Sequence, residues 1–205
     1  MTINEFNHWL KKEWAKVCPI LAVYFPLFIF LFVKPHDFVL FLIFIQVPIY
    51  YLHQTEEYIF PGGFQRFFNL DIFKLGNPEQ PLNENRIFVI NIMVTWVLLP
   101  LFSFLSMIDY SWGFWIPYFS IFAGLGHVIL GIKAKKLYNP GLIVSLLLNI
   151  PLGIWAVWKL ATMGIITSPY FNLSLLIGFL LNALLPIYGA IIGKRYRKQL
   201  QEHKN

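Results

Sequence analysis

The sequence predicts an all-α fold, a polytopic transmembrane bundle of about six helices. Of the 205 residues, 58% are hydrophobic and only 13% are charged, whereas a soluble domain carries about 25% charged residues. Residues 17–33 and 87–107 contain no acidic or basic side chain, and each stretch is long enough to span a hydrocarbon core about 30 Å thick. We therefore expect residues 1–205 to form a single membrane domain surrounded by the lipid bilayer.

Charges, glycines and prolines bound the first three predicted helices. The first helix, residues 16–33, follows a segment that mixes aromatic and charged residues and does not have the pattern of a cleaved signal peptide. The second helix, residues 37–60, ends at Pro61-Gly62-Gly63, a sequence that stops helices. The third helix, residues 85–107, contains the second uncharged stretch.

The last three predicted helices begin at aromatic or capping residues. Tyr110 and Trp112 mark the start of the fourth helix, as is typical of a membrane interface. Asn139-Pro140 pairs a capping side chain with a proline at the first helical position of the fifth helix, and Ser168-Pro169 repeats this pattern for the sixth. The expected ranges are 112–133, 140–160 and 170–193.

The distribution of basic residues predicts the orientation of the bundle. The amino-terminal segment, the connections after the second and fourth helices and the carboxy tail together hold 14 lysines and arginines, whereas the opposite connections hold only Lys34 and Lys159. The positive-inside rule then places both termini in the cytoplasm and the protein in the cell membrane. The same rule accounts for the net charge of +6 without a nucleic-acid partner.

Residues 61–84 form the one long predicted connection. Its several phenylalanines, with Leu70 and Ile72, make it too apolar for a free polar linker. We expect a short amphipathic element in the cytoplasmic interface. A lid over the most polar helix is the alternative interpretation.

The predicted helices contain few strongly polar side chains, and these are candidates for function because an unpaired polar group inside a bilayer costs several kcal/mol. At 100° per residue, Glu56 and Glu57 flank His53 one turn away. His53 and His127 each stand eight residues before the inner end of their helix, roughly 12 Å along the axis. Asn91 and Asn139 are expected near the same level, so the polar groups converge on the inner half of the bundle.

The run His53-Gln54-Thr55-Glu56-Glu57 resembles the signature of the HXXEE-domain family of bacterial membrane proteins. The size and hydropathy of the chain are similar to that family as well. The resemblance implies a multi-pass helical protein in which His53, Glu56 and Glu57 are the residues that name the family. It implies no particular reaction.

Two imidazoles and one carboxylate can bind zinc or another divalent transition metal and leave a position for water. We expect the metal ligands to be His53, His127 and one of the two glutamates, which we assign as Glu57 while Glu56 stays open as the alternative. Glu56 and Glu57 are the catalytic candidates, since the glutamate that is not a ligand can act as a general base. The leading hypothesis is a metal-dependent hydrolase that acts on a lipid or lipid-linked substrate at the cytoplasmic leaflet.

Two other functions fit the same residues. A small transporter or proton-coupled carrier would use the buried glutamates and histidines as a relay, although such sites usually lie near the midplane on repeated, broken helices. A non-catalytic protective or scaffolding protein would use them to fix helix packing. In the plainest interpretation, the carboxylates reach the membrane surface, the imidazoles bond backbone carbonyls and Asn139 caps a helix.

Overall fold

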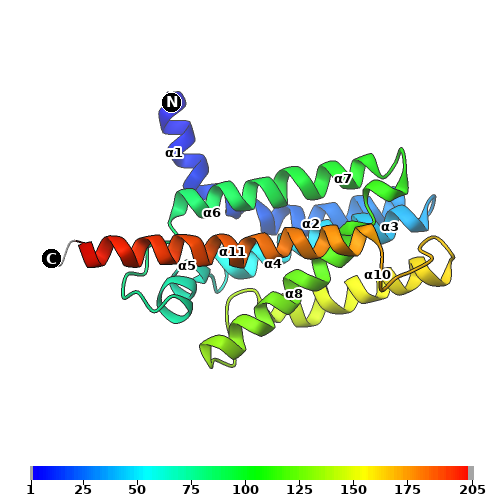
Figure 1. Ribbon diagram of the computed structural model, residues 1–205. Helices are drawn as coiled ribbons and strands as arrows, with labels where there is room; N and C mark the ends of the chain where they lie inside the picture. Colours follow the sequence, from blue (N-terminus) through cyan, green and yellow to red (C-terminus); the bar gives the residue numbers. More distant parts are fainter. Residues whose placement is uncertain (1, 203–205) are drawn as a thin grey trace.

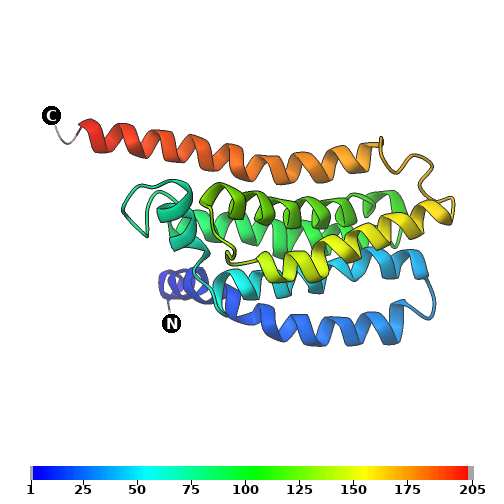
Figure 2. The ribbon, with the colours of Figure 1, turned by 90° about the horizontal axis from the view of Figure 1, so that it is seen from below.

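The computed structural model describes residues 2–202, and within them the protein is all helical, without strands. Six helical stretches are long and apolar enough to cross a membrane, which confirms the predicted fold class. They run roughly side by side, and both ends of the described chain lie at the same end of the bundle (Figures 1 and 2). The six stretches are Ile3–Val33, Phe38–Tyr58, Glu84–Leu105, Tyr110–Ala134, Leu142–Thr162 and Leu173–Glu202.

The first stretch combines α1 (Ile3–Glu13), η1 (Trp14–Val17), α2 (Cys18–Phe28) and η2 (Ile29–Val33). Thr2 and Glu5 form a capping box at the start of α1, where the two side chains satisfy backbone N–H groups that have no partner within the helix. The α1 helix buries none of its residues and projects sideways from the bundle (Figure 1). The membrane-crossing part of this stretch is therefore preceded by a separate surface helix.

The second stretch lies in the centre of the bundle and consists of α3 (Phe38–Phe44) and α4 (Gln46–Tyr58). Asp37 caps α3 by accepting a hydrogen bond from the backbone N–H of Leu40. The α4 helix buries ten of its thirteen residues, polar and apolar together, from Gln46 to Glu57. A helix that is buried on all sides can place polar side chains only against other protein groups.

A short helical segment and a long connection follow. The chain turns through α5 (Phe64–Phe67) and η3 (Phe68–Ile72), then crosses back through α6 (Glu84–Asn91), η4 (Ile92–Leu98) and α7 (Leu99–Leu105). The buried amide of Asn69 organises the connection, because it donates to the carbonyls of Pro78 and Leu82 and accepts from the N–H of Leu82. The connection is thus a folded cap on the end of the bundle, not a free linker.

The fourth and fifth stretches contain η5 (Tyr110–Trp112), α8 (Trp115–Ala134), α9 (Leu142–Val144), η6 (Ser145–Asn149) and α10 (Ile150–Thr162). The α8 helix packs against α10, η6 and α11 (Leu173–Glu202). The α11 helix extends to Glu202, beyond the expected end near residue 193, because its polar last turns leave the bundle on the side of the chain termini (Figure 2).

Two expected helix caps are wrong. Gly141, not Asn139, precedes the fifth helix, with a φ of 98°, and the Asn139 side chain is buried against α8 instead. The sixth helix begins at Leu173, where Asn172 accepts a hydrogen bond from the N–H of Leu175. In both places the helix starts a few residues after the proline, so the residue before that proline cannot cap it.

Candidate metal centre

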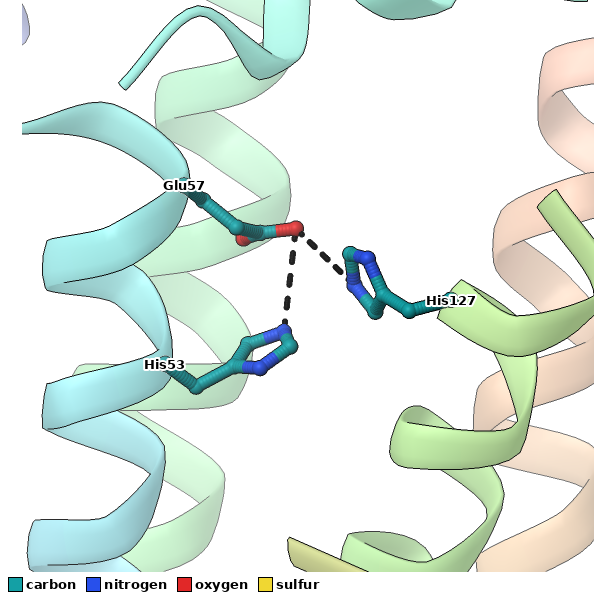
Figure 3. A group of neighbouring side chains, drawn as sticks. All are labelled: His53, Glu57 and His127. Atoms are coloured by element: carbon teal, nitrogen blue, oxygen red, sulfur yellow. Dashed lines mark ion pairs between the residues drawn. The ribbon is translucent and has the colours of Figure 1, made fainter. Parts of the chain in front are cut away.

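The candidate site begins on α4, where His53 and Glu57 are separated by one helical turn. Residues at positions i and i+4 project from the same face of a helix, and this face of α4 is turned toward α8 (Figure 3). The Nε2 atom of His53 lies 3.7 Å from Oε1 of Glu57. Both side chains are buried, with only 2% and 5% of the residue surface exposed.

His127 on α8 completes the group. Its Nε2 atom lies 3.2 Å from the same Oε1 atom of Glu57, and its ring centroid is 4.6 Å from that of His53. One possible ligand atom from each of the three residues can be chosen so that all lie within 4.8 Å of one another. Figure 3 shows one carboxylate oxygen of Glu57 joined to both imidazoles, with His53 and Glu57 on α4 and His127 on α8.

Asn139 fixes the proton on the His127 ring. The Asn139 amide nitrogen donates to the backbone carbonyl of His127, at 3.0 Å, so its oxygen must be the atom that faces Nδ1 of His127, at 2.8 Å. A carbonyl oxygen accepts, so Nδ1 carries the hydrogen. In the neutral ring, Nε2 therefore presents its lone pair to Glu57.

Ser145 determines, by the same reasoning, which nitrogen of the His53 ring carries the hydrogen. The Ser145 hydroxyl donates to the carbonyl of Gly141, at 2.6 Å, and its oxygen faces Nδ1 of His53 at 3.4 Å. The hydroxyl hydrogen is already used, so Nδ1 of His53 is the donor of this long contact and Nε2 again points at Glu57 with a lone pair. Gln54 holds the other carboxylate oxygen through a donated bond of 2.8 Å.

With both imidazoles neutral, three hydrogen-bond acceptors thus converge on one buried region, within 4.8 Å of one another. Ligand atoms about 2.1 Å from a tetrahedral ion are about 3.4 Å apart, and the two Nε2 to Oε1 separations of 3.2 and 3.7 Å lie on either side of that value. The outer nitrogens of both rings are held by other protein groups, as in known metal sites. This buried group could hold a metal ion.

The family pattern described as "Protein of unknown function with HXXEE motif" matches residues 44–156, more than half of the chain. The chain belongs to the HXXEE family. Comparison with curated proteins and with solved structures gives no match. The matched range includes His53, Glu57, His127, Asn139 and Ser145, so the whole candidate centre lies within the part that defines the HXXEE family.

The second glutamate position of the HXXEE motif faces the candidate centre, and the first does not. Glu56 accepts hydrogen bonds from the backbone N–H groups of Ile143 and Val144, at 3.0 and 2.7 Å. These N–H groups are free at the start of the fifth helix, where a carboxylate is favoured. Glu56 therefore lies outside the group that His53, Glu57 and His127 form, although both glutamates are one turn from His53 on α4.

Tyr138 lies next to Glu56, in the connection that follows α8. Burial and the neighbouring Glu56 carboxylate raise the pKa of Tyr138 to about 12. The phenol therefore keeps its proton throughout the physiological range. A neutral donor beside Glu56 supports the carboxylate without adding charge.

Asn91, the remaining expected site residue, is placed beside the centre and not in it. Its amide nitrogen donates to the Tyr58 hydroxyl, at 3.1 Å, and to the carbonyl of Ile87, at 2.9 Å. Tyr58 directly follows Glu57, so Asn91 fixes the end of α4. Its contacts belong to helix packing.

Several contributors to the HXXEE centre were not expected from the sequence. Gln54 lies within the motif and is three residues before Glu57, a spacing that could have indicated the contact. Ser145 and Phe64 are far from the motif in sequence, and only the folded chain brings them near it. The Phe64 ring lies 5.8 Å from that of His127, so the connection after α4 covers the centre.

Gly141 completes the surroundings of His127. A Cβ atom at position 141 would lie 2.5 Å from Cε1 and 2.9 Å from both ring nitrogens of His127. With a φ of +98°, the backbone here is in the region that favours glycine. The close approach of this backbone to the imidazole therefore requires glycine.

Proposed function

We propose that this HXXEE protein is a metal-dependent hydrolase of the membrane, with His53, Glu57 and His127 as ligands of zinc or another divalent transition metal. The observation that carries the proposal is the convergence of three acceptor atoms whose neighbours leave lone pairs facing one point. Two imidazoles and one carboxylate are the protein ligands of several hydrolytic zinc sites.

Such a site supplies a nucleophile in an apolar setting. Three protein ligands leave one tetrahedral position for water, and the metal lowers the pKa of that water toward neutrality. In hydrolysis of an ester, the water oxygen bonds to the carbonyl carbon or the phosphorus, the bond to the alcohol oxygen breaks, and the released proton goes to the leaving alkoxide. The lipid or lipid-linked substrate then yields an alcohol and an acid.

The position of the centre supports a substrate that enters from one face. His53 and Glu57 lie in the last two turns of α4, at the end of the bundle where α1 and the α11 terminus lie (Figure 2). The basic residues predict that this end faces the cytoplasm. We propose access from the cytoplasmic leaflet.

The contacts separate the roles of the two glutamates. We assign Glu57 to the metal because one of its oxygens approaches both histidines. Glu56 is engaged by two backbone N–H groups, and we propose that it positions the start of the fifth helix, which carries Ser145. This arrangement makes a general-base role for Glu56 less suitable than a positioning role.

Metal binding is the first test. Purified protein in detergent is stripped with a chelator, reloaded separately with zinc, iron(II) or manganese(II), and analysed by inductively coupled plasma mass spectrometry. We expect about one ion per chain for the preferred metal, and its loss in His53→Gln, Glu57→Gln and His127→Gln. The His36→Ala variant is the matched control, because His36 is an exposed histidine in the turn before α3.

Hydrolysis is tested on a mixture of lipids, because an isotope label marks any product that forms. Metal-loaded protein is reconstituted with a bacterial total lipid extract in ¹⁸O-labelled water, and lipids are analysed for products that carry one heavy oxygen. We expect labelled products that depend on both His53 and His127. A protein that binds one metal per chain but yields no labelled product contradicts the hydrolase, and a protein without bound metal contradicts the whole proposal.

A carrier is the second candidate, and one observation favours it. The oxygen atoms Oε1 of Gln46, Oε1 of Gln54 and Oδ1 of Asn149 are buried and have no hydrogen-bond partner in the described part of the chain. Gln46 precedes His53 by two turns of α4, so acceptor groups continue from the centre toward the other end of the bundle. Metal uptake into proteoliposomes that depends on both His53 and Gln46 would support a carrier over the hydrolase.

A further inference from the structure

A second feature of the same end of the bundle is a pocket between α1, η1, the end of α4, α5 and the start of α6. Its volume is about 390 Å³, which is sufficient for the headgroup of a lipid. The HXXEE motif and His127 do not line it. The pocket is therefore a separate place from the candidate metal centre.

Basic side chains dominate the polar part of the pocket. Lys11, Lys12, Lys16 and Arg66 line it together with Glu13 and Glu84. Lys16 pairs with Glu13, whereas Lys11, Lys12 and Arg66 form no ion pair with any residue in the range 2–202. Four basic and two acidic side chains thus line one cavity, and three of the cations are not engaged in an ion pair within that range. The resulting excess of positive charge favours an anionic ligand.

The rest of the pocket wall is largely apolar and adjoins an exposed apolar residue. Trp14, Tyr58, Ile59 and Phe64 contribute to it, and Phe60, which follows Ile59, is 80% exposed. The α1 helix carries further exposed apolar residues and two lysines in its last turn, a pattern typical of a helix that lies in the membrane interface. A ligand that fits both parts of this wall has an anionic head and an apolar tail.

The pocket and the metal centre share a boundary. Phe64 lines the pocket, and its ring is 5.8 Å from the His127 ring and 5.9 Å from the Tyr58 ring. Tyr58 also lines the pocket and follows Glu57 directly in sequence. A molecule held in the pocket therefore reaches within one aromatic side chain of the candidate metal ligands.

We propose that this pocket binds a phosphate-bearing lipid, with Lys11, Lys12 and Arg66 holding the phosphate and the aromatic wall holding the start of the acyl chains. The class of substrate that follows, a phospholipid or lipid phosphate, rests on the hydrolase proposed above. The binding site itself does not depend on it. Phe64 lies between the bound lipid and His127, so its side chain controls the approach of the lipid to the centre.

Binding to full-length protein in detergent micelles tests the pocket. Native mass spectrometry measures the affinities of dioleoyl phosphatidic acid, dioleoyl phosphatidylcholine and soluble glycerol 3-phosphate. We expect phosphatidic acid to bind most tightly and the variant Lys11→Gln/Lys12→Gln/Arg66→Gln to weaken it at least about tenfold. The matched control, Lys133→Gln/Lys194→Gln/Arg195→Gln, removes the same charge outside the pocket and should retain affinity within about twofold.

The outcomes separate the pocket from general surface charge. Equal losses in the pocket variant and the control, or equal affinities for phosphatidic acid and phosphatidylcholine, would overturn the site. Glycerol 3-phosphate bound as tightly as phosphatidic acid would overturn its assignment to a lipid. Retained specific binding of phosphatidic acid by a folded pocket variant would overturn the site itself.

Metal analysis of the same samples distinguishes this inference from the proposed function. We expect the pocket variant to keep its metal, and His53→Gln to lose metal but keep phosphatidic acid. Specific lipid binding by a protein that takes up no metal refutes the hydrolase and supports the pocket. A metal-loaded, hydrolytically active protein without specific lipid binding refutes only the pocket.

Discussion

Replacement of Gly141 by alanine should disable the candidate metal centre through His127. The added Cβ would lie 2.5 Å from Cε1 of His127, whereas ordinary contacts begin at 3.4 Å, so the ring must move by about 0.9 Å. Metal sites tolerate deviations of only about 0.2 Å in ligand distance. We expect at least a tenfold loss of metal affinity, measured by competition with a fluorescent chelator. The positive φ adds a folding cost of about 1 to 3 kcal/mol.

Two glycine variants separate these effects. Gly76→Ala has a comparable positive φ, +71°, but nothing within 4 Å of the new Cβ, so it should lower thermal stability and keep metal affinity. Gly126→Ala adds a methyl group one residue before His127, also with nothing within 4 Å, and should change neither strongly. If Gly141→Ala keeps full metal affinity and loses only as much thermal stability as Gly76→Ala, then the position of the His127 ring does not control metal binding as proposed.

Three further changes test the surroundings of the centre. Asn139→Ala should lower metal affinity about 10- to 100-fold, because the His127 ring is no longer held. An unchanged metal affinity in the chelator competition assay would show that Asn139 does not orient this ring. Glu56→Ala should keep the metal but speed hydrogen exchange at the amides of Ile143 and Val144, at a cost of about 1 to 3 kcal/mol; loss of metal would instead indicate a ligand. Asn69→Ala removes three hydrogen bonds and should make the connection after α5 sensitive to limited proteolysis, whereas an unchanged cleavage pattern would show that the amide is dispensable.

The number of helices could be predicted from the sequence because it depends only on the number of long apolar stretches. A stretch of about 20 apolar residues has few stable alternatives to a helix in a bilayer, since each backbone polar group must be bonded within the segment. Helix starts were harder to predict. Asn139 is a capping residue type followed by proline, and the sequence therefore predicts a cap. In the structure its amide forms two hydrogen bonds with His127 on α8 instead, so tertiary contacts outweigh the local preference.

The grouping of polar residues was predictable only as far as helix geometry reaches. Counting residues from the helix ends placed His53 and His127 at one level, and the structure brings their rings to a separation of 4.6 Å. The rotation of each helix about its axis was not available from that count. The rotation of α4 determines that Glu57 faces α8 while Glu56 faces the start of the fifth helix.

The energetics of the centre support the proposal that it holds a cation. Gln54, Asn139 and Ser145 use their donors or acceptors so that the atoms left facing inward are lone pairs. Buried acceptors without a donor are costly, and an arrangement that merely fixed helix packing would pair them with donors from neighbouring helices. Here the neighbours do the reverse, because they orient both imidazoles toward the carboxylate and away from other partners. A metal ion satisfies all three atoms at once, and a proton shared between Glu57 and one histidine satisfies only two.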